Sequence, residues 1–268
     1  MITRFIRAFR KRADGQEGDP QPESLTGIVR KFISRWLLLC LAGLLFVAAA
    51  WGGYQLHFLR KNQQYNAKAV SDYVDSYLME CNRDLQYVAT FFMRPLGDIS
   101  ILHNFLLTNA NFQEIYLLNS LGKTLRSVPA EAGEASFSGM IRATPVQTEF
   151  YLTSPYYSSY KKELVVSMIR PISRDRMILA ELDLEALQAS VSELTRHMRS
   201  GFAILTDEKG NIIAHPDMSQ VDHRLNRSML KLVSAPSKGQ AQSSFYWTSD
   251  GYELLSVTKA GSSNWKII

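Results

Sequence analysis

Cysteine is scarce in this chain of 268 residues, which contains Cys40 and Cys81 and no others. Cys40 lies in a long uncharged run, so Cys81 is the only cysteine in the more polar remainder. No disulfide can therefore form within that remainder. We expect Cys81 to be a small buried residue, and the alternative is an intermolecular bridge in a dimer.

The familiar motifs of catalysis are also missing. The sequence has no glycine-rich phosphate loop, no G-x-S-x-G elbow and no HExxH motif. No kinase, cyclase or methyl-accepting segment is visible either. We therefore predict that the chain is not an enzyme. A membrane-anchored hydrolase is the opposing hypothesis, and it would need a nucleophile and a base within hydrogen-bond reach in a cleft.

A surplus of positive charge is missing from most of the chain. Eight of the 30 Lys and Arg residues and four of the 25 Asp and Glu residues lie in residues 1–35, which leaves 22 basic and 21 acidic residues in the remainder. A near-neutral remainder lacks the concentrated basic surface of nucleic-acid-binding proteins. We therefore expect no nucleic-acid partner.

The sequence does contain one long apolar run, Trp36–Leu59, whose 24 residues include no Asp, Glu, Lys or Arg. As a helix, this run is long enough to cross roughly 30 Å of hydrocarbon. Trp36, Trp51 and Tyr54 lie near its ends, where aromatic rings favour the lipid interface. A buried core helix or a cleaved signal peptide fits less well, because the run is long and begins 35 residues into the chain. We predict a transmembrane helix at 36–59.

The flanking charges predict the orientation of this helix. The eight basic residues before it outnumber Arg60, Lys61 and Lys68, which closely follow it. By the positive-inside rule, residues 1–35 form a cytoplasmic basic tail and the main domain lies outside. In a bacterium this corresponds to a single-pass protein of the inner membrane with a periplasmic domain.

A helical pattern continues beyond the apolar run. Apolar residues recur every three or four positions, as one face of a helix requires, at Val70, Val74, Tyr77, Cys81, Leu85, Val88 and Phe92. Nothing interrupts the pattern before Pro95, so we predict a long periplasmic helix over 60–94. A shorter helix is expected at about Asp98 to Thr108.

Strand patterns then dominate, and one of them occurs twice. Ile115–Pro129 and Gly201–Asp217 each contain an apolar run, a polar turn with glycine and a second apolar run, which is typical of a β-hairpin. With Gly122 placed over Gly210, Tyr116 matches Ile204, Leu117 matches Leu205, Asn119 matches Asp207 and Leu125 matches Ile213. The repeat predicts two similar modules that combine helices with antiparallel sheets.

In their order along the chain, these segments resemble a known family. The segments "NANFQEIYLLNSLGKTLRS", "YLTSPYYSSYKKELVVSMIRPI", "MILAELDLEALQASV", "GFAILTDEKGNIIAHPD" and "YELLSVTKAGSSNWKII" follow a membrane helix and a long helix. This arrangement resembles the double Cache (dCache) extracytoplasmic sensor domain of bacterial transmembrane receptors, over about residues 56–268.

The resemblance implies an α+β fold with one N-terminal transmembrane helix that continues into a long helix and two tandem PAS-like antiparallel-sheet modules. A membrane-distal Cache module is expected at 95–183 and a membrane-proximal Cache module at 184–268. The family usually continues into a second membrane helix and a cytoplasmic output. Because the sequence stops at "NWKII", we expect the proximal module to be truncated at its C-terminus.

The resemblance also implies a ligand pocket in the distal module. The residues expected to line it are Tyr151, Tyr156, Tyr157, Arg142, Arg170 and Asp183. Aromatic walls with a few placed polar groups suit a small-molecule pocket. For the tyrosines, the competing interpretation is ordinary strand packing.

Two positions compare directly with the amino-acid-sensing members of this family, and one of them, Tyr156, matches a pocket tyrosine of those members. Asp183 occupies the position of an aspartate that faces the ligand's ammonium group, and the competing interpretation is an N-cap for the helix that follows. Those members also carry an Arg and a Trp-Tyr pair for the ligand's carboxylate. The corresponding segment here, "FSGMIRATPVQTEFYL", has Arg142 but no Trp-Tyr pair.

A metal interpretation of "HPDMSQVDH" would use His215, Asp217, Asp222 and His223. The segment lacks helical His spacing and Cys pairs, so turn chemistry around Pro216 is the preferred interpretation. We expect no metal and no cofactor.

The sequence thus predicts the ligand-sensing region of a bacterial receptor, with a small-molecule ligand of the amino acid, amine or organic acid class. A homodimer is expected, with an output domain of diguanylate cyclase, histidine kinase or chemotaxis type. The alternative is a single-span membrane scaffold or assembly protein that binds protein partners through its periplasmic domain.

Overall fold

The computed structural model describes residues 25–93, 99–133, 135–141, 149–196, 201–233, 241–248 and 251–268. The chain divides into two compact units, Met1–His57 and Phe58–Ile268. The helix α2 (Leu25–Phe92) contributes residues to both units.

In the first unit, α2 carries the apolar run predicted to cross a membrane. The helix is long and apolar enough to do so by length and composition. Its large apolar side chains lie exposed, with Leu44 at 69% and Phe46 at 75% of full accessibility. Apolar side chains that contact no protein suit a helix surrounded by lipid, so this part of α2 fits a single-pass membrane protein.

In the second unit, α2 contributes one face to the hydrophobic core. The residues predicted at helical spacing are all buried, namely Val70, Val74, Tyr77, Cys81, Leu85, Val88 and Phe92. They belong to one core cluster with apolar residues of both sheets. Cys81 is fully buried and free, as predicted, and burial raises the pKa of its thiol to about 12. The thiol therefore stays protonated and acts as a small apolar residue.

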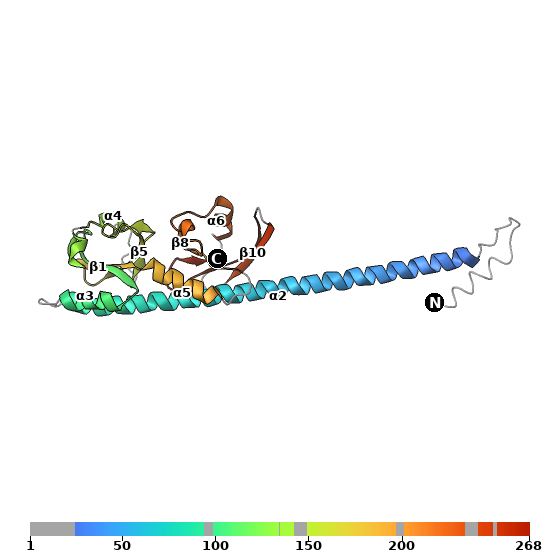
Figure 1. Ribbon diagram of the computed structural model, residues 1–268, viewed down its shortest axis with the longest axis horizontal. Helices are drawn as coiled ribbons and strands as arrows, with labels where there is room; N and C mark the ends of the chain where they lie inside the picture. Colours follow the sequence, from blue (N-terminus) through green and yellow to red (C-terminus); the bar gives the residue numbers. More distant parts are fainter. Residues whose placement is uncertain are drawn as a thin grey trace. The chain divides into compact units, whose positions relative to one another are not determined.

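The first sheet is antiparallel, with strands in the order β2-β1-β6-β5-β3 and with β4 paired to β5. Its strands are β1 (Phe112–Asn119), β2 (Thr124–Val128), β3 (Tyr151–Leu152), β4 (Tyr156–Tyr157), β5 (Leu164–Pro171) and β6 (Arg176–Leu182). Three short helical elements accompany it, α3 (Ile99–Thr108), η1 (Ala130–Ala132) and α4 (Ser138–Ile141). Figure 1 shows α4 on the opposite side of this sheet from α2.

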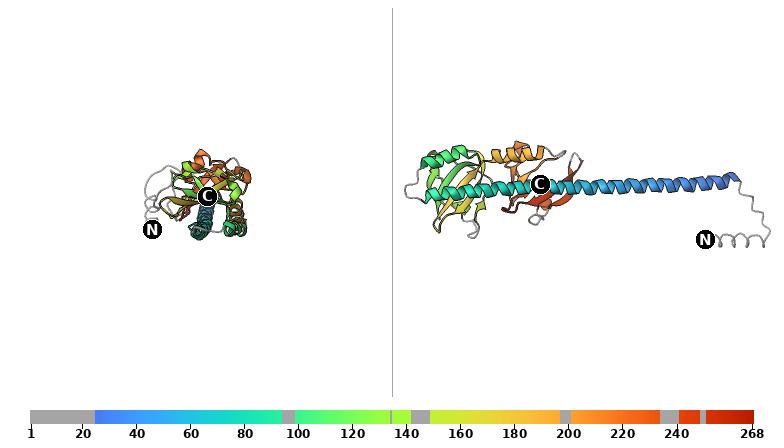
Figure 2. Two further views of the ribbon diagram at one scale, coloured as in Figure 1. Left: turned by 90° about the vertical axis from the view of Figure 1, so that its left-hand side faces the viewer. Right: turned by 90° about the horizontal axis from the view of Figure 1, so that it is seen from below.

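The second sheet is also antiparallel, in the order β8-β7-β11-β10-β9. Its strands are β7 (Leu205–Thr206), β8 (Ile212–Ala214), β9 (Gln242–Thr248), β10 (Gly251–Lys259) and β11 (Lys266–Ile267). The accompanying helices are α5 (Leu184–Arg196), η2 (Met218–Gln220) and α6 (Arg227–Val233). The two sheets follow one another along α2 (Figure 2), which confirms the predicted α+β fold with two tandem antiparallel-sheet modules.

The repeated hairpin is present in both modules with the same backbone bonds. Gly122 donates to the carbonyl of Asn119 at 2.9 Å, and Gly210 donates to the carbonyl of Asp207 at 3.1 Å. Both glycines have a positive φ, 78° and 84°, which L side chains rarely adopt. The side chains of Asn119 and Asp207 each accept a backbone N–H four residues later, so the sequence offset predicts a structural repeat.

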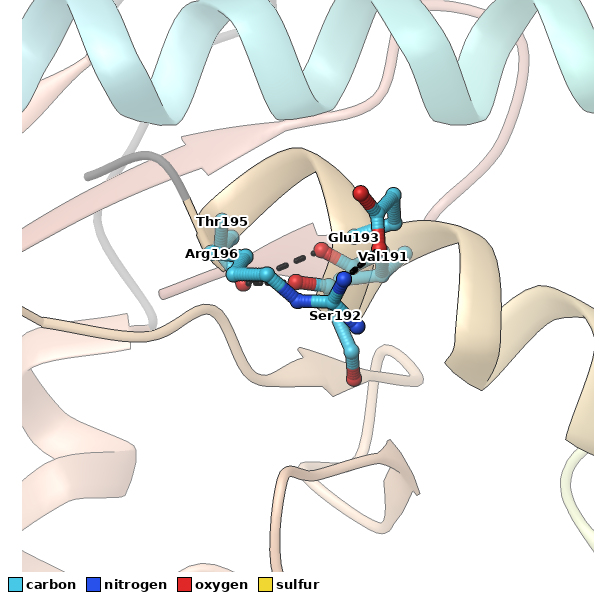
Figure 3. A network of polar contacts seen from close by, with 5 residues as sticks. All are labelled: Val191, Ser192, Glu193, Thr195 and Arg196. Carbon is cyan, nitrogen blue, oxygen red and sulfur yellow. Dashed lines mark hydrogen bonds and ion pairs between the residues drawn. The ribbon is translucent and has the colours of Figure 1, made fainter.

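The helix α5 connects the first sheet to the second, and a local network holds its last turn (Figure 3). The Thr195 hydroxyl donates to the carbonyl oxygens of Val191 at 3.0 Å and Ser192 at 3.2 Å. Arg196 and Glu193 form an ion pair of 2.7 Å on the exposed side. An exposed pair of this kind contributes little stability, so the buried Thr195 is the more important member of the network.

Candidate ligand-binding site

The first sheet has two covered faces with different chemistry. Successive strand residues point to opposite faces, so Ile115 and Leu117 join the α2 core while Tyr116 and Leu118 lie on the other side. We call this other side the cap face. Its apolar cluster consists of Tyr116, Leu118, Ala132, Phe137, Ile169 and Leu179. The elements η1 and α4 therefore cover the cap face much as α2 covers the opposite one.

Two glutamates lie on the cap face at directly opposing positions. Glu114 of β1 and Glu181 of β6 are cross-strand partners, and both are fully buried. Like charges at directly opposing strand positions repel one another, and burial adds a desolvation cost for each charge. We refer to Glu114 and Glu181 as the carboxyl pair.

Tyrosine and serine hydroxyls surround the carboxyl pair. The Tyr116 hydroxyl donates to Glu114 Oε2, and Ser158 Oγ donates to the same oxygen at 3.4 Å. The Tyr156 hydroxyl donates to Glu181 Oε1 at 2.8 Å and lies 2.6 Å from Ser167 Oγ. We name the whole set the glutamate–tyrosine cluster: Glu114, Tyr116, Tyr156, Ser158, Ser167 and Glu181.

One oxygen of each carboxyl group has no partner. Glu114 Oε1 and Glu181 Oε2 are buried without a hydrogen bond. In the part of the chain that the structure describes, no lysine or arginine forms an ion pair with either group. The pair therefore has unused acceptor capacity for a positively charged group.

The electrostatics of the cluster follow from burial and from the opposing charge. Burial, and then repulsion by Glu114, raises the pKa of Glu181 to about 7. Burial also raises the pKa values of the Tyr116 and Tyr156 hydroxyls well above their usual value, so both remain protonated donors. Below about pH 7 the Glu181 carboxyl group is therefore mostly protonated, opposite a second buried carboxyl group.

Two of the residues predicted to line a pocket lie together on this face. Tyr156 belongs to the glutamate–tyrosine cluster, and Tyr151 of β3 is half-buried against the apolar part of the cap face. Tyr151 pairs across the strands with Ile169, whose side chain points the same way. These two tyrosines give the cap face aromatic walls beside a polar centre.

The structure places three other predicted residues elsewhere. Tyr157 is 60% exposed, and its hydroxyl donates to Asp222 in the second module at 2.8 Å. Arg170 points to the opposite face of the sheet, where its guanidinium donates to Asn82 of α2. Asp183 accepts the backbone N–H of Ala186 at 3.0 Å and so caps α5.

Arg142 lies outside the described residues.

The carboxyl pair itself was missed by the sequence interpretation. In "FQEIYLLN", Glu114 occupies the same alternation as Tyr116 and Leu118, and in "RMILAEL", Glu181 alternates with Leu179. The signal available in the sequence was a single charged residue in each strand, at a position where the alternation predicts an apolar one. A strand covered on both faces is expected to be apolar on both.

The segment considered for a metal forms turns instead. Asp217 caps η2 by accepting the N–H of Ser219 at 3.0 Å, and its own N–H donates to His215 Nδ1 at 3.0 Å. Within the described ranges, no group of three or more His, Cys, Asp or Glu side chains could hold a metal ion.

A separate cavity lies in the second module. It has a volume of about 520 Å³, and its walls combine α2 residues such as Gln63 with apolar groups such as Phe202 and Leu255. The size suits a small molecule. Glu253 is the only acidic side chain in its lining as described, so this cavity lacks the paired carboxyl groups of the cap face.

Comparison with known proteins identifies a matching family and several solved structures of similar fold. The profile of a Cache domain family, dCache_1, matches residues 54–268. No curated protein is recognisably similar in sequence. Among solved structures, the extracellular domain of rpHK1S-Z16, described as a histidine kinase, is 12% identical with a TM-score of 0.65, covering 79% of this chain and 93% of that one.

Two chemoreceptor domains are also similar. The ligand-binding domain of Pseudomonas fluorescens CtaA in complex with L-isoleucine is 18% identical with a TM-score of 0.63, covering 80% of this chain and 92% of that one. The ligand-binding domain of the Pseudomonas aeruginosa amino acid chemoreceptor PctB in complex with L-Gln is 18% identical with a TM-score of 0.58, covering 77% and 88%. At these identities the likeness shows the fold.

Proposed function

This chain belongs to the Cache domain family of double (dCache) type, and from that premise we propose that it is the ligand-sensing region of a bacterial membrane receptor. The Cache domain is a non-catalytic sensor domain, and the similar solved structures are ligand-binding or extracellular domains of chemoreceptors and of a histidine kinase. The family and the fold therefore support a sensing role.

The ligand in this proposal binds on the cap face of the distal module and carries a cationic nitrogen. The observation that supports it is the glutamate–tyrosine cluster, which presents two buried carboxyl oxygens without partners beside the tyrosine walls. A protonated amine would satisfy those oxygens through charge-assisted hydrogen bonds. The amino acids named for CtaA and PctB, L-isoleucine and L-Gln, also carry an ammonium group.

The signal would pass from the cap face to the membrane through α2. The first sheet contacts α2 on its other face, and α2 continues without a break into the apolar run. A ligand that favours one arrangement of the sheet relative to α2 would raise the population of that arrangement. The size of the shift depends on the difference in the ligand's affinity for the two arrangements. We propose a homodimer with a cytoplasmic N-terminus and a periplasmic sensor domain, coupled to an output domain of diguanylate cyclase, histidine kinase or chemotaxis type.

A scaffold that binds protein partners is the competing proposal. A distal core filled by apolar side chains would favour the scaffold, because a purely structural core requires no buried charged group. The cap face instead holds two buried carboxyl groups, which are destabilising unless a partner or a proton compensates them. That arrangement favours a ligand-binding role.

The test is a binding screen of the full chain in lipid nanodiscs against amino acids, organic acids, amines and purines. A ligand that binds the native state raises the unfolding temperature by mass action. We expect hits among compounds with a cationic nitrogen, confirmed by calorimetry. No stabilisation by any of the four classes would contradict the sensor proposal.

Two neighbouring tyrosines provide a matched pair of variants for any hit. Tyr156→Phe removes the hydroxyl that bonds Glu181, and Tyr157→Phe removes an exposed hydroxyl on the same strand. We expect Tyr156→Phe to weaken binding about tenfold or more, the effect of one hydrogen bond to a charged group, and Tyr157→Phe to leave it unchanged. Equal affinities for the two variants would place the ligand elsewhere, such as the cavity of the second module.

A further inference from the structure

The carboxyl pair cannot carry two charges in the arrangement described. Glu114 and Glu181 are fully buried and directly opposed across β1 and β6. Their remaining oxygens have no donor, and no described lysine or arginine pairs with them. Two uncompensated carboxylates on directly opposed strand residues, in a poorly solvated site, would repel one another strongly. The pair therefore requires either a shared proton or a bound cation.

We propose that the carboxyl pair is a proton-for-cation exchange site, at which the ammonium group of an organic amine takes the place of the proton shared by Glu114 and Glu181. This inference rests on the proposed function, since it uses the same face of the distal module, and it adds the ligand class and a coupling to pH. No covalent bond forms or breaks. The proton leaves to water as the ammonium group enters.

The charge balance of the exchange explains the preferred ligand class. With one shared proton the pair has one net negative charge, and with an alkylammonium in place of the proton the total is the same. A diamine would neutralise the site entirely. An amino acid would add its own carboxylate, and hence a further negative charge beside two others. The site thus favours amines that lack a carboxylate.

The groups that face the pair confine the exchange to its two members. Among the described residues, Tyr116 from β1 and Tyr156 from β4 are the other titratable groups that bond the pair, and both stay protonated because burial raises their pKa values. Ser158, which follows β4, and Ser167 of β5 do not titrate. The cap elements contribute apolar side chains such as Phe137 and Met140.

The geometry of β5 separates the pair from the nearest described cation on that strand. Arg170 lies on the face toward α2, where it bonds Asn82, so it does not share the cap face with the carboxyl groups. Burial and the opposing charge raise the pKa of Glu181 to about 7, which places the exchange in an accessible pH range. An amine remains protonated throughout that range, as lysine does.

The experiment compares a matched series of four-carbon probes on the full chain in lipid nanodiscs. The probes are 1-butylamine, 1,4-diaminobutane, 4-aminobutyrate and butyrate. Calorimetry in two buffers of different ionisation enthalpy measures the protons released per ligand. We expect the two amines to bind best and to release close to one proton at about pH 6. Their affinity should therefore rise with pH, by up to about tenfold per pH unit, and level off above about pH 7.

Variants separate the pair from other acids of the module. Glu181→Gln removes the carboxyl group whose pKa is raised while keeping the shape of the side chain, and Glu131→Gln makes the same charge change at an exposed position of η1. We expect Glu181→Gln to abolish both proton release and the pH dependence of amine affinity, and to weaken binding at least tenfold. We expect Glu131→Gln to behave like the parent chain.

The outcomes distinguish this inference from the proposed function. Binding of 4-aminobutyrate or butyrate in preference to the amines, or amine binding without proton release, would overturn the exchange site and leave a sensor in place. Absence of binding by these probes and by every class in the wider screen would overturn both. Proton release that persists in Glu181→Gln would also overturn the exchange site.

Discussion

Asp75 of α2 holds Ser262 of the β10–β11 loop through two hydrogen bonds. The Ser262 backbone N–H and hydroxyl donate to Asp75 Oδ1 at 2.8 and 2.5 Å. The N–H of Gly261 donates to Asp75 Oδ2 at 2.6 Å. One carboxylate on the long helix thus fixes a loop 187 residues later in the chain. These charge-assisted bonds tie the loop of the second sheet to α2.

Replacement of Asp75 by alanine should therefore loosen the second module. Hydrogen bonds to a charged acceptor contribute about 1.5–3 kcal/mol each, and some are partly exposed here, so we expect a loss of about 2 kcal/mol in the free energy of unfolding. Denaturant titration of the full chain measures it. Asp72→Asn, an exposed position one turn earlier on α2, is the control. A change no larger than that of the control would show that the loop is held by packing alone.

Asp183 offers a direct choice between two roles. Its side chain accepts the N–H of Ala186, and its carbonyl accepts the N–H of Leu187. Because Asn caps helices as well as Asp, Asp183→Asn should leave both stability and amine affinity unchanged. Asp183→Ala should cost about 1 kcal/mol with no effect on affinity. Loss of ligand affinity in Asp183→Asn, measured by calorimetry, would instead support the ammonium-binding role.

The fold was largely predictable because its main signals are local and periodic. The spacing of Val70, Val74 and the apolar positions that follow marks the buried stripe of α2 over several turns. The hairpin glycines mark strand pairs through a backbone requirement that few other residues meet. Both signals survive in a single sequence because each depends on a few neighbouring residues.

The centre of the site was harder to predict because it depends on pairing between distant strands. Glu114 and Glu181 each appear in the sequence as a single charged residue within a mostly apolar strand, with nothing to pair one with the other. The register of β1 against β6 places them opposite one another, and η1 and α4 are among the elements that cover their face. Conversely, Arg170 was assigned to the pocket from its strand, but the alternation of β5 directs it to α2.

The two hairpin glycines should differ in their tolerance of a side chain. A Cβ on Gly122 would lie 2.8 Å from the backbone of Ser138, whereas a Cβ on Gly210 would meet the end of the Leu230 side chain at 2.2 Å. Both substitutions also strain a left-handed backbone by about 1–2 kcal/mol. Because a leucine side chain can move more readily than a backbone, Gly122→Ala should be the more destabilising variant.

Thermal unfolding of both variants tests this order. Gly139→Ala is the control, since a Cβ there meets nothing within 4 Å and its φ is not positive. We expect the control to be neutral or more stable than the parent chain, by up to about 1 kcal/mol. Equal losses for Gly122→Ala and Gly210→Ala would mean that backbone strain, and not the neighbouring atoms, dominates at both turns.

The stability of the chain should fall as the pH rises, because of the carboxyl pair. The pKa of Glu181 is raised from 4.5 to about 7 in the folded state, so the folded state holds this proton more tightly than the unfolded state. The contribution is fully present below about pH 4.5 and is lost as pH rises through about 7. The shift corresponds to at most about 3 kcal/mol of stability lost by about pH 8.

Glu181→Gln should remove this pH dependence, since an amide cannot ionise. We expect the variant to unfold at a higher temperature than the parent chain at about pH 8 and at a similar temperature at about pH 5. Glu131→Gln should unfold at the same temperature as the parent chain at both pH values. If the unfolding temperature changes equally with pH in all three proteins, the carboxyl pair is excluded as the source of the pH dependence. If the difference is found, the free energy lost when the pair ionises is also the free energy that a bound ammonium group can restore. A stabilised Glu181→Gln variant that has lost amine binding would therefore show that the two properties have one physical origin.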